Sequence, residues 1–325
     1  MEWTIGKILQ WGESYLKKYS PTPRLDMEII LAHTLLIKRI ALYLDYFRPL
    51  TKDELERLRG FVKRRAQFEP VAYITGIKEF WSMDFQVNKS TLIPRPETEL
   101  IVERAIQIVK KKEKENGACG RILNKGERLR ILDLGTGCGN LAIALAKEFP
   151  FSLVIAMDFC PEALLMAREN ARNLVGERPI SFIRGSFFQP LRLKDVSKPF
   201  HLVVSNPPYI PHEEMVNLPL NVKNFEPIQS LDGGPEGMDC IREIIEKAHL
   251  VLKADSHLVV EIGLNQAGRV ADIIAESRHW KNLEFIKDHQ GIDRVFSVAK
   301  QGVGNGSDGY CRGYQAKRGG GNQRG

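Results

Sequence analysis

Short apolar segments alternate with amphipathic ones between residues 129 and 300, and this alternation constrains the fold more than any other feature. The apolar segments include LRILDLG, SLVIAMD, ISFIRGS and HLVVSN, separated by helix-like segments such as NLAIALAKEF and PEALLMARENARNL. Strands that are apolar along their whole length are typical of parallel sheets covered by helices on both faces. The pattern predicts an open, doubly wound α/β domain of about seven strands. LEFIKD and DRVFSVAK are expected to close it as a hairpin.

The remainder of the chain divides into three parts. Residues 1–88 are predicted to form a small helical bundle, with Thr51 and Glu54 as a capping box before one helix. FWSMDFQV alternates like a strand, and residues 89–128 are interpreted as a hairpin and linker helix (97–110) followed by a charged, flexible insertion (111–128). Residues 301–325 are rich in glycine and arginine and are predicted to be disordered.

Composition excludes several classes of protein. No apolar run approaches the ~18 residues that span a bilayer, and the segment MEWT does not begin a signal peptide. The five cysteines include no C-x-x-C pair, so we predict neither a metal site nor disulfides. We therefore expect a cytoplasmic, monomeric protein. The net charge of +7 is compatible with a partner on or near RNA, although a solvated basic surface is the favoured interpretation for most of it.

A glycine-rich loop, ILDLGTGCGN, follows the first strand of the α/β region. Gly135, Gly137 and Gly139 alternate with Thr136 and Cys138, at the edge where open α/β sheets bind ligands. The nicotinamide fingerprint G-x-G-x-x-G/A would need glycine or alanine at position 140, which is asparagine here. The loop therefore suits a nucleoside cofactor that has no pyrophosphate.

Residues at the ends of the next two strands extend this predicted site. Asp158 ends the second strand, where a carboxylate can accept hydrogen bonds from both ribose hydroxyls. Ser186 and Phe187 follow the third strand, where an adenine edge and face would lie. For Phe187, packing in the core is an equally good interpretation.

The fourth strand ends in a rigid corner, VVSNPPYIPH. The side-chain carbonyl of Asn206 and the backbone carbonyl of Pro207 can accept both hydrogens of a planar –NH2 group, and Tyr209 can cover the group by stacking. Such positioning aims the delocalised lone pair of an amide or aryl nitrogen at an electrophilic methyl group. The alternative is a plain proline turn, because Asn-Pro is a common turn dipeptide.

A [D/N/S]-P-P-[Y/F/W] corner behind a G-x-G-x-G loop resembles the amino-group methyltransferases that use S-adenosylmethionine. These enzymes act on adenine, cytosine or guanine amino groups or on protein glutamine. Segments in both halves, including PRLDMEIILAHTLL, EPVAYITGIKEFWSMDF, TLIPRPETE and NFEPIQSLDGGPEGMD, resemble the HemK/PrmC family, glutamine N5-methyltransferases of peptide chain release factors. The similarity covers roughly residues 3–300.

This resemblance implies a cofactor, a substrate and roles for individual residues. S-adenosylmethionine would bind at Gly135 to Gly139, Asp158, Phe187 and Asn206. Residues Asn206, Pro207, Pro208 and Tyr209 would hold the glutamine of the Gly-Gly-Gln motif of a class-1 release factor, with Asn206, Pro207 and Tyr209 serving catalysis. The helical domain would dock the release factor. Arg95 and Glu97 would either shape the site or form salt bridges that fix the loop.

The chain departs from the family pattern at Ser186 and Glu97, where aspartate is usual, and in the charged insertion and the glycine-rich tail. Three other functions remain as alternatives. The first is glutamine methylation of a ribosomal protein, and the second is N6-methylation of DNA adenine, although no base-reading domain is evident. The third is a binding module that keeps the fold without the chemistry.

Overall fold

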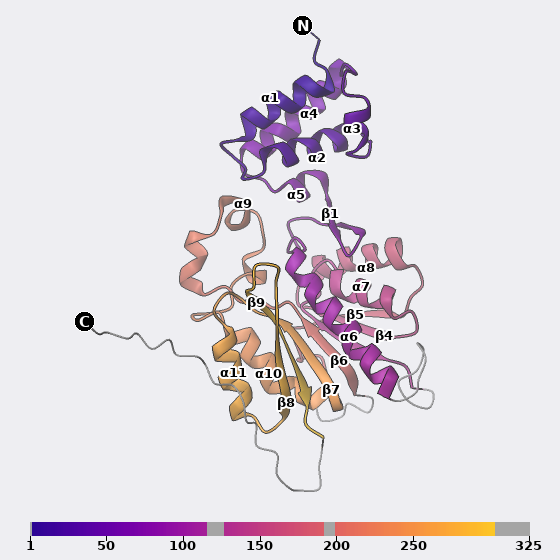
Figure 1. The fold of residues 1–325 in the computed structure, drawn as a ribbon, viewed down its shortest axis with the longest axis vertical. Coiled ribbons are helices and arrows are strands. Elements are labelled where there is room, and N and C mark those ends of the chain that lie inside the picture. Colours follow the sequence, from indigo (N-terminus) through magenta and orange to yellow (C-terminus); the bar gives the residue numbers. More distant parts are fainter. Residues whose placement is uncertain (1, 116–126, 192–198, 303–325) are drawn as a thin grey trace, which may run out of the picture.

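A seven-stranded sheet forms the centre of the computed structural model, which describes residues 2–115, 127–191 and 199–302 (Figure 1). The strand order is β5-β4-β3-β6-β7-β9-β8. The strands are β3 (Arg130–Leu134), β4 (Leu153–Asp158), β5 (Ile180–Arg184), β6 (Phe200–Ser205), β7 (Leu252–Glu261), β8 (Trp280–Lys287) and β9 (Asp293–Lys300). β3 to β7 pair in parallel, and β9 runs antiparallel to both β7 and β8. The doubly wound α/β fold and its terminal hairpin are confirmed.

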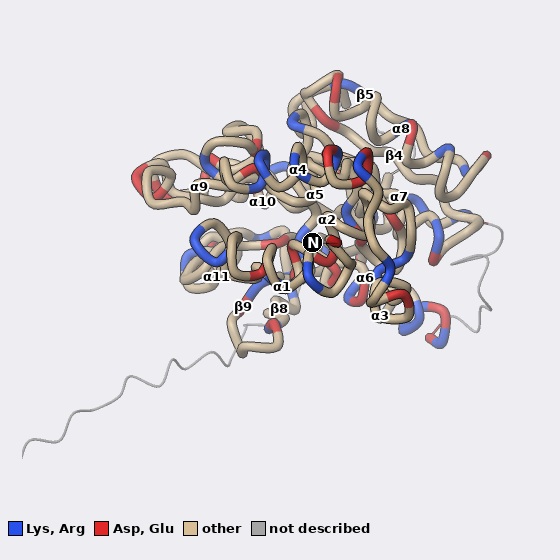
Figure 2. Tube along the Cα trace, turned by 90° about the horizontal axis from the view of Figure 1, so that it is seen from above, with Lys and Arg blue, Asp and Glu red and all other residues tan. Residues whose placement is uncertain are grey.

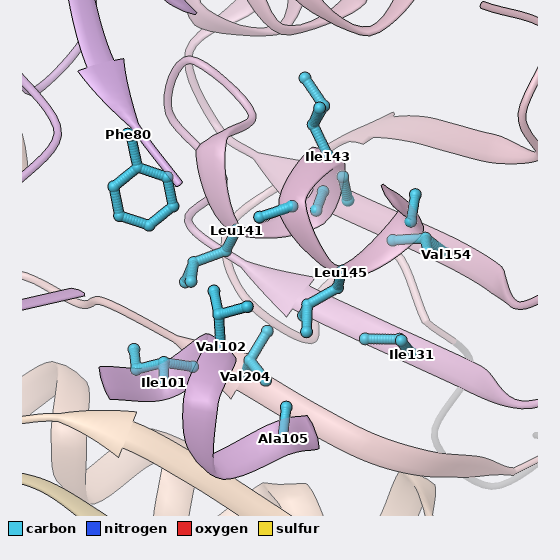
Figure 3. Close-up of a cluster of buried hydrophobic side chains, with 14 of the residues drawn as sticks. Phe80, Ile101, Val102, Ala105, Ile131, Leu141, Ile143, Leu145, Val154 and Val204 are labelled. Carbon is cyan, nitrogen blue, oxygen red and sulfur yellow. The ribbon is translucent and has the colours of Figure 1, made fainter. Parts of the chain in front are cut away.

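Helices cover both faces of this sheet, which explains why its central strands β3, β4 and β6 are largely apolar. Ile131 of β3 packs into one cluster with α6 (Glu99–Glu115) and α7 (Asn140–Glu148), part of which is drawn in Figure 3. Its neighbour Leu132 packs into the opposite cluster with α10 (Asp239–Val251) and α11 (Ala267–Glu276). α8 (Pro161–Val175) adds Ala171 to the first cluster. Successive strand residues thus point to opposite faces, and both faces are buried.

The first part of the chain forms a helical bundle with its own apolar core. Its helices are α1 (Ile5–Leu16), α2 (Pro23–Leu35), α3 (Ala41–Leu44), α4 (Lys52–Ala66) and α5 (Val71–Thr75). The predicted capping box is present at the start of α4, because Thr51 and Glu54 each accept a backbone N–H of the other. In Figure 1 the bundle lies above the sheet, on the same side as α9 (Leu220–Lys223) in the long segment that follows β6.

A hairpin contains the predicted FWSMDFQV strand, which is divided by a turn, and it lies before residue 89. β1 (Ile77–Phe80) and β2 (Met83–Gln86) pair antiparallel within the first 88 residues rather than in the linker. Trp81 and Ser82 in the turn both have positive φ, 52° and 53°, a geometry usually signalled by Asn-Gly. Trp81 is held there because its backbone N–H donates to Glu99 (2.7 Å) and its indole N–H to Glu148 (2.9 Å).

The helix of the linker is longer than predicted, since α6 continues to Glu115 instead of ending at residue 110. Residues 111–115, expected to be flexible, are lysines and glutamates, which favour helix. Lys112 in this extension donates to the backbone carbonyl of Asp255. The rest of the predicted insertion, 116–126, and the tail from 303 lie outside the described residues.

Figure 2 shows lysine and arginine interspersed with aspartate and glutamate in the view from above, rather than gathered into one basic face. None of the helices in the described part of the chain combines the length and apolarity that crossing a membrane requires. The segment after β6 also contains the short helices η3 (His212–Asn217) and η4 (Ile228–Ser230), and η1 (Pro96–Thr98) precedes α6.

Candidate active site

The glycine loop turns sharply between β3 and α7, directly beside the end of β4. Gly135, Gly137 and Gly139 all have positive φ, at 72°, 55° and 88°. A Cβ atom built on Gly135 or Gly137 would meet no protein atom within 4 Å, so the backbone there faces open space. A Cβ on Gly139 would lie 3.1 Å from Cβ of Ala167 in α8. Two of the glycines therefore leave room for a ligand, and the third lets two helices approach.

Asp158 lies against this loop, as the sequence predicted for a cofactor site. Its Oδ2 accepts the backbone N–H of Gly137 (2.8 Å), and its Oδ1 accepts that of Cys160 (2.9 Å). Each carboxylate oxygen keeps a second lone pair, which suits two adjacent hydroxyl groups. Burial raises the pKa of Asp158, while the backbone N–H groups of Cys160 and Gly137 oppose the rise.

The side chains of Thr136 and Cys138 are buried, so only their backbone could touch a ligand. Thr136 Oγ1 donates to Oδ2 of Asp133 (2.6 Å), a fully buried residue that the sequence analysis missed. Burial raises the pKa of Asp133 to about 7. Its other oxygen, Oδ1, has no partner among the described residues. An acidic residue inside an apolar strand was the available signal, because such a charge is costly to bury.

The residues predicted near an adenine lie at the end of β5. Phe187 is half-buried, packs against the apolar cluster of α10 and α11, and has a φ of 39°. Ser186 is exposed, and its carbonyl accepts the N–H of Gln189. The half-buried ring of Phe187 packs on the core and leaves part of its surface accessible to a ligand, so its position is compatible with both interpretations.

The proline corner begins where β6 ends, next to the glycine loop. Ser205 pairs with Leu134 of β3, and its hydroxyl donates to the Leu134 carbonyl (2.7 Å). A cleft of about 190 Å³ opens at the corner. It is lined by Asn206, Pro207, Tyr209, Ile210, Leu92, Arg95, Leu218, Val222, Ser230 and Leu231. Pro208 is not among the described residues that line this cleft.

A chain of hydrogen bonds behind the cleft connects Asn206 with Tyr209. Asn206 Nδ2 donates to Thr98 Oγ1 (3.0 Å), and Thr98 Oγ1 donates to Oε2 of Glu261 (2.6 Å). The Tyr209 hydroxyl donates to the other oxygen of the same carboxylate (3.0 Å). Glu261 is fully buried at the end of β7, and desolvation raises its pKa to about 7. The sequence analysis missed Thr98 and Glu261.

Two further side chains fix the walls of the cleft. Arg95 donates to Oε1 of Glu226 (2.5 Å), whose side chain is completely buried, and Glu226 Oε2 also accepts the N–H of Ile93 (3.2 Å). Arg95 thus both lines the cleft and forms a loop-fixing salt bridge, the two roles considered for it. Gln266 Nε2 donates to the backbone carbonyls of Tyr209 (2.9 Å) and Gly237 (3.0 Å).

Two family models match the two halves of the chain. Residues 125–300 match the family model described as a methyltransferase domain, and residues 7–76 match one described as the PrmC N-terminal domain. The crystal structure of the hMettl16 catalytic domain in complex with MAT2A 3′UTR hairpin 6 has a similar fold, with a TM-score of 0.53 at 13% identity. That match covers 75% of this chain and 84% of the other. The α/β half is thus a methyltransferase domain.

Curated relatives identify the family within that class. The release factor glutamine methyltransferase of Geobacter sulfurreducens is 37% identical over 90% of this chain and 95% of its own length. The protein of the same name from Chlorobaculum tepidum is 35% identical, over 92% of this chain and 98% of its own length. The chain belongs to the family of release factor glutamine methyltransferases.

Proposed function

We propose that this protein transfers a methyl group from S-adenosylmethionine to the side-chain amide nitrogen of the glutamine in the Gly-Gly-Gln motif of a class-1 release factor. The observation that carries the proposal is the orientation of Asn206 in the cleft. Its amide nitrogen is engaged with Thr98, which leaves Oδ1 as the acceptor available to a ligand. The names of the curated relatives support the choice of acceptor.

The residues of the glycine loop fit S-adenosylmethionine. Gly135 and Gly137 face open space, and the two carboxylate oxygens of Asp158 are proposed to accept the two ribose hydroxyls. Phe187 is proposed to cover one face of the adenine. When bound, this cofactor supplies an electrophilic methyl group on a sulfonium centre. Release of S-adenosylhomocysteine as the product follows from this chemistry.

The corner is proposed to hold the acceptor amide. Asn206 Oδ1 and the carbonyl of Pro207 accept the two N–H bonds of the glutamine side chain, and the ring of Tyr209 covers its plane. Pro208 contributes rigidity, because consecutive prolines fix φ. Alignment of this kind contributes to catalysis because it removes the need to order the reactants during the reaction.

The two acceptors also stabilise the charge that develops on the nitrogen. An amide nitrogen that forms a bond to carbon becomes more positive, and its N–H groups then donate more strongly to Asn206 and Pro207. One of these protons leaves to solvent after the new bond forms. A strong base is therefore not needed before methyl transfer.

Methyl incorporation into purified class-1 release factor tests the proposal. Radiolabelled cofactor should label the wild-type release factor and not a variant with the acceptor Gln→Ala. Asn206→Ala should lower kcat about a hundredfold, because the acceptor amide would lose the alignment that Asn206 provides. A folded wild-type enzyme that binds the cofactor but labels no release factor would contradict the proposal. Ribosomal proteins and duplex DNA, added as separate substrates, test the two alternative acceptors.

A further inference from the structure

We infer that Thr98 and Glu261 are positioning residues that hold Asn206 with its carboxamide oxygen turned toward the acceptor amide. This inference rests on the proposed function, and it concerns residues that lie behind the cleft rather than in it. Thr98 belongs to η1, Asn206 follows β6, and Glu261 ends β7. Three segments distant in sequence therefore meet in one chain of hydrogen bonds.

The direction of each hydrogen bond follows from the donors available. An ionised carboxylate only accepts, so Thr98 and Tyr209 must both donate their single hydroxyl proton to Glu261. Thr98 Oγ1 can then only accept from its remaining neighbour, Asn206. The group of Asn206 that faces Thr98 must be the NH2 (3.0 Å), and Oδ1 is left for the cleft.

Burial makes this orientation specific. Thr98 and Glu261 are each 1% exposed, so water does not compete for these hydrogen bonds. A wrong orientation of Asn206 would set its oxygen against the Thr98 oxygen, leaving two buried acceptors without a proton between them. The same carboxylate also fixes Tyr209, so one buried group orients two residues of the corner.

The charge on Glu261 is what sets the direction. Burial raises its pKa to about 7, with Thr98 and Tyr209 opposing the rise. Among charged groups, Glu97 raises this pKa further, and Arg294 of β9 lowers it. A protonated Glu261 can donate to Thr98, whose own proton can then turn toward Asn206. Asn206 Oδ1 could rotate to accept it, and the acceptor amide would face an NH2 group instead.

Paired substitutions of Thr98 test the inference. Thr98→Val keeps the shape and removes the hydroxyl, so kcat for methyl transfer should fall by at least about tenfold. Thr98→Ser keeps the hydroxyl and should restore most of the loss. Thr34→Val is the matched control, because Thr34 is also a buried threonine, bonded to the Ile30 carbonyl (2.7 Å) within the helical bundle.

The pH dependence of kcat gives a second measurement that does not require Thr98→Val to fold. In the wild type, kcat should fall as pH decreases through about 7, where Glu261 takes up its proton. Glu261→Gln cannot titrate, so its lower kcat should lack this acid limb.

Any one of three results would overturn the inference. These are a wild-type kcat in Thr98→Val, equal losses of kcat in Thr98→Val and Thr98→Ser, and an unchanged acid limb in Glu261→Gln. Failure of the proposed function looks different, because the wild-type enzyme itself would then label no release factor.

Discussion

Gly135→Ala tests whether the open space beside the glycine loop is where the cofactor binds. Gly135 has a φ of +72°, and a Cβ there would meet no protein atom within 4 Å. Gly291, in the turn between β8 and β9, has a φ of +81° and equally open surroundings. β8 is the edge strand, separated from β3 by β6, β7 and β9. Gly291→Ala is therefore a matched control with the same backbone strain far from the loop.

Both substitutions should cost similar stability. An alanine in the left-handed region is disfavoured by about 1–2 kcal/mol. The reduced freedom of the unfolded chain offsets about 0.4–1 kcal/mol of this. A net loss of about 1 kcal/mol lowers Tm by about 2–4 °C in a domain of this size.

Only Gly135→Ala should weaken cofactor binding, because only its methyl group occupies the space proposed for the ligand. Displacing the ribose from Asp158 removes one or two hydrogen bonds to a charged group, each contributing about 1.5–3 kcal/mol. The Kd for S-adenosylmethionine should therefore rise about 10- to 100-fold. Isothermal titration calorimetry measures this, with thermal melting to confirm folding. Equal Kd values for the Gly135→Ala and Gly291→Ala proteins would refute the placement of the cofactor.

Three further outcomes are expected from other parts of the site. Asp158→Ala should weaken cofactor binding about 10- to 100-fold by calorimetry, and unchanged affinity would contradict its assignment to the ribose. Arg95→Ala leaves the buried Glu226 carboxylate without its ion-pair partner. The free energy of unfolding, measured with denaturant, should fall by about 2–3 kcal/mol, which is less than for a fully buried pair because the Arg95 side chain is 32% exposed. Asp133 has a folded pKa raised to about 7, so its contribution to stability falls as pH rises from about 4 to about 7. Asp133→Asn should remove that part of the pH dependence of Tm. An unaltered pH profile of Tm would contradict the assignment of this dependence to Asp133.

The regular parts of the chain were predictable because their signals are periodic. Continuous apolar strands indicated a sheet buried on both faces, and Thr51 with Glu54 indicated the cap that begins α4. The hairpin was misplaced because its turn uses Trp81 and Ser82 instead of residues that tolerate positive φ. That turn is stabilised by tertiary hydrogen bonds to Glu99 and Glu148, which no local pattern reveals.

Site residues at the ends of strands could be predicted from the sequence. Residues that lie behind the cleft and contact those residues could not. Asn206 and Asp158 stand at the ends of β6 and β4, so topology alone places them at the ligand edge. Thr98 was hidden within a proline-rich segment, and its partner Glu261 lies 163 residues further along the chain. The available signal was Glu261 itself, a charged residue that directly follows the buried apolar run Leu258-Val259-Val260 in β7 and therefore requires a buried partner.

The stretch between the two family matches contributes residues to the candidate site. Neither family match covers residues 77–124, yet Leu92 and Arg95 from this stretch line the cleft. Thr98, a few residues on, accepts a hydrogen bond from Asn206 behind the cleft. The buried pair of Arg95 and Glu226 ties the same stretch to the segment after β6. A fragment limited to the methyltransferase match would therefore keep the glycine loop and Asp158 but lose one wall of the acceptor cleft. The proposed cofactor site is self-contained in the α/β domain, whereas the acceptor site depends on the chain that leads into it.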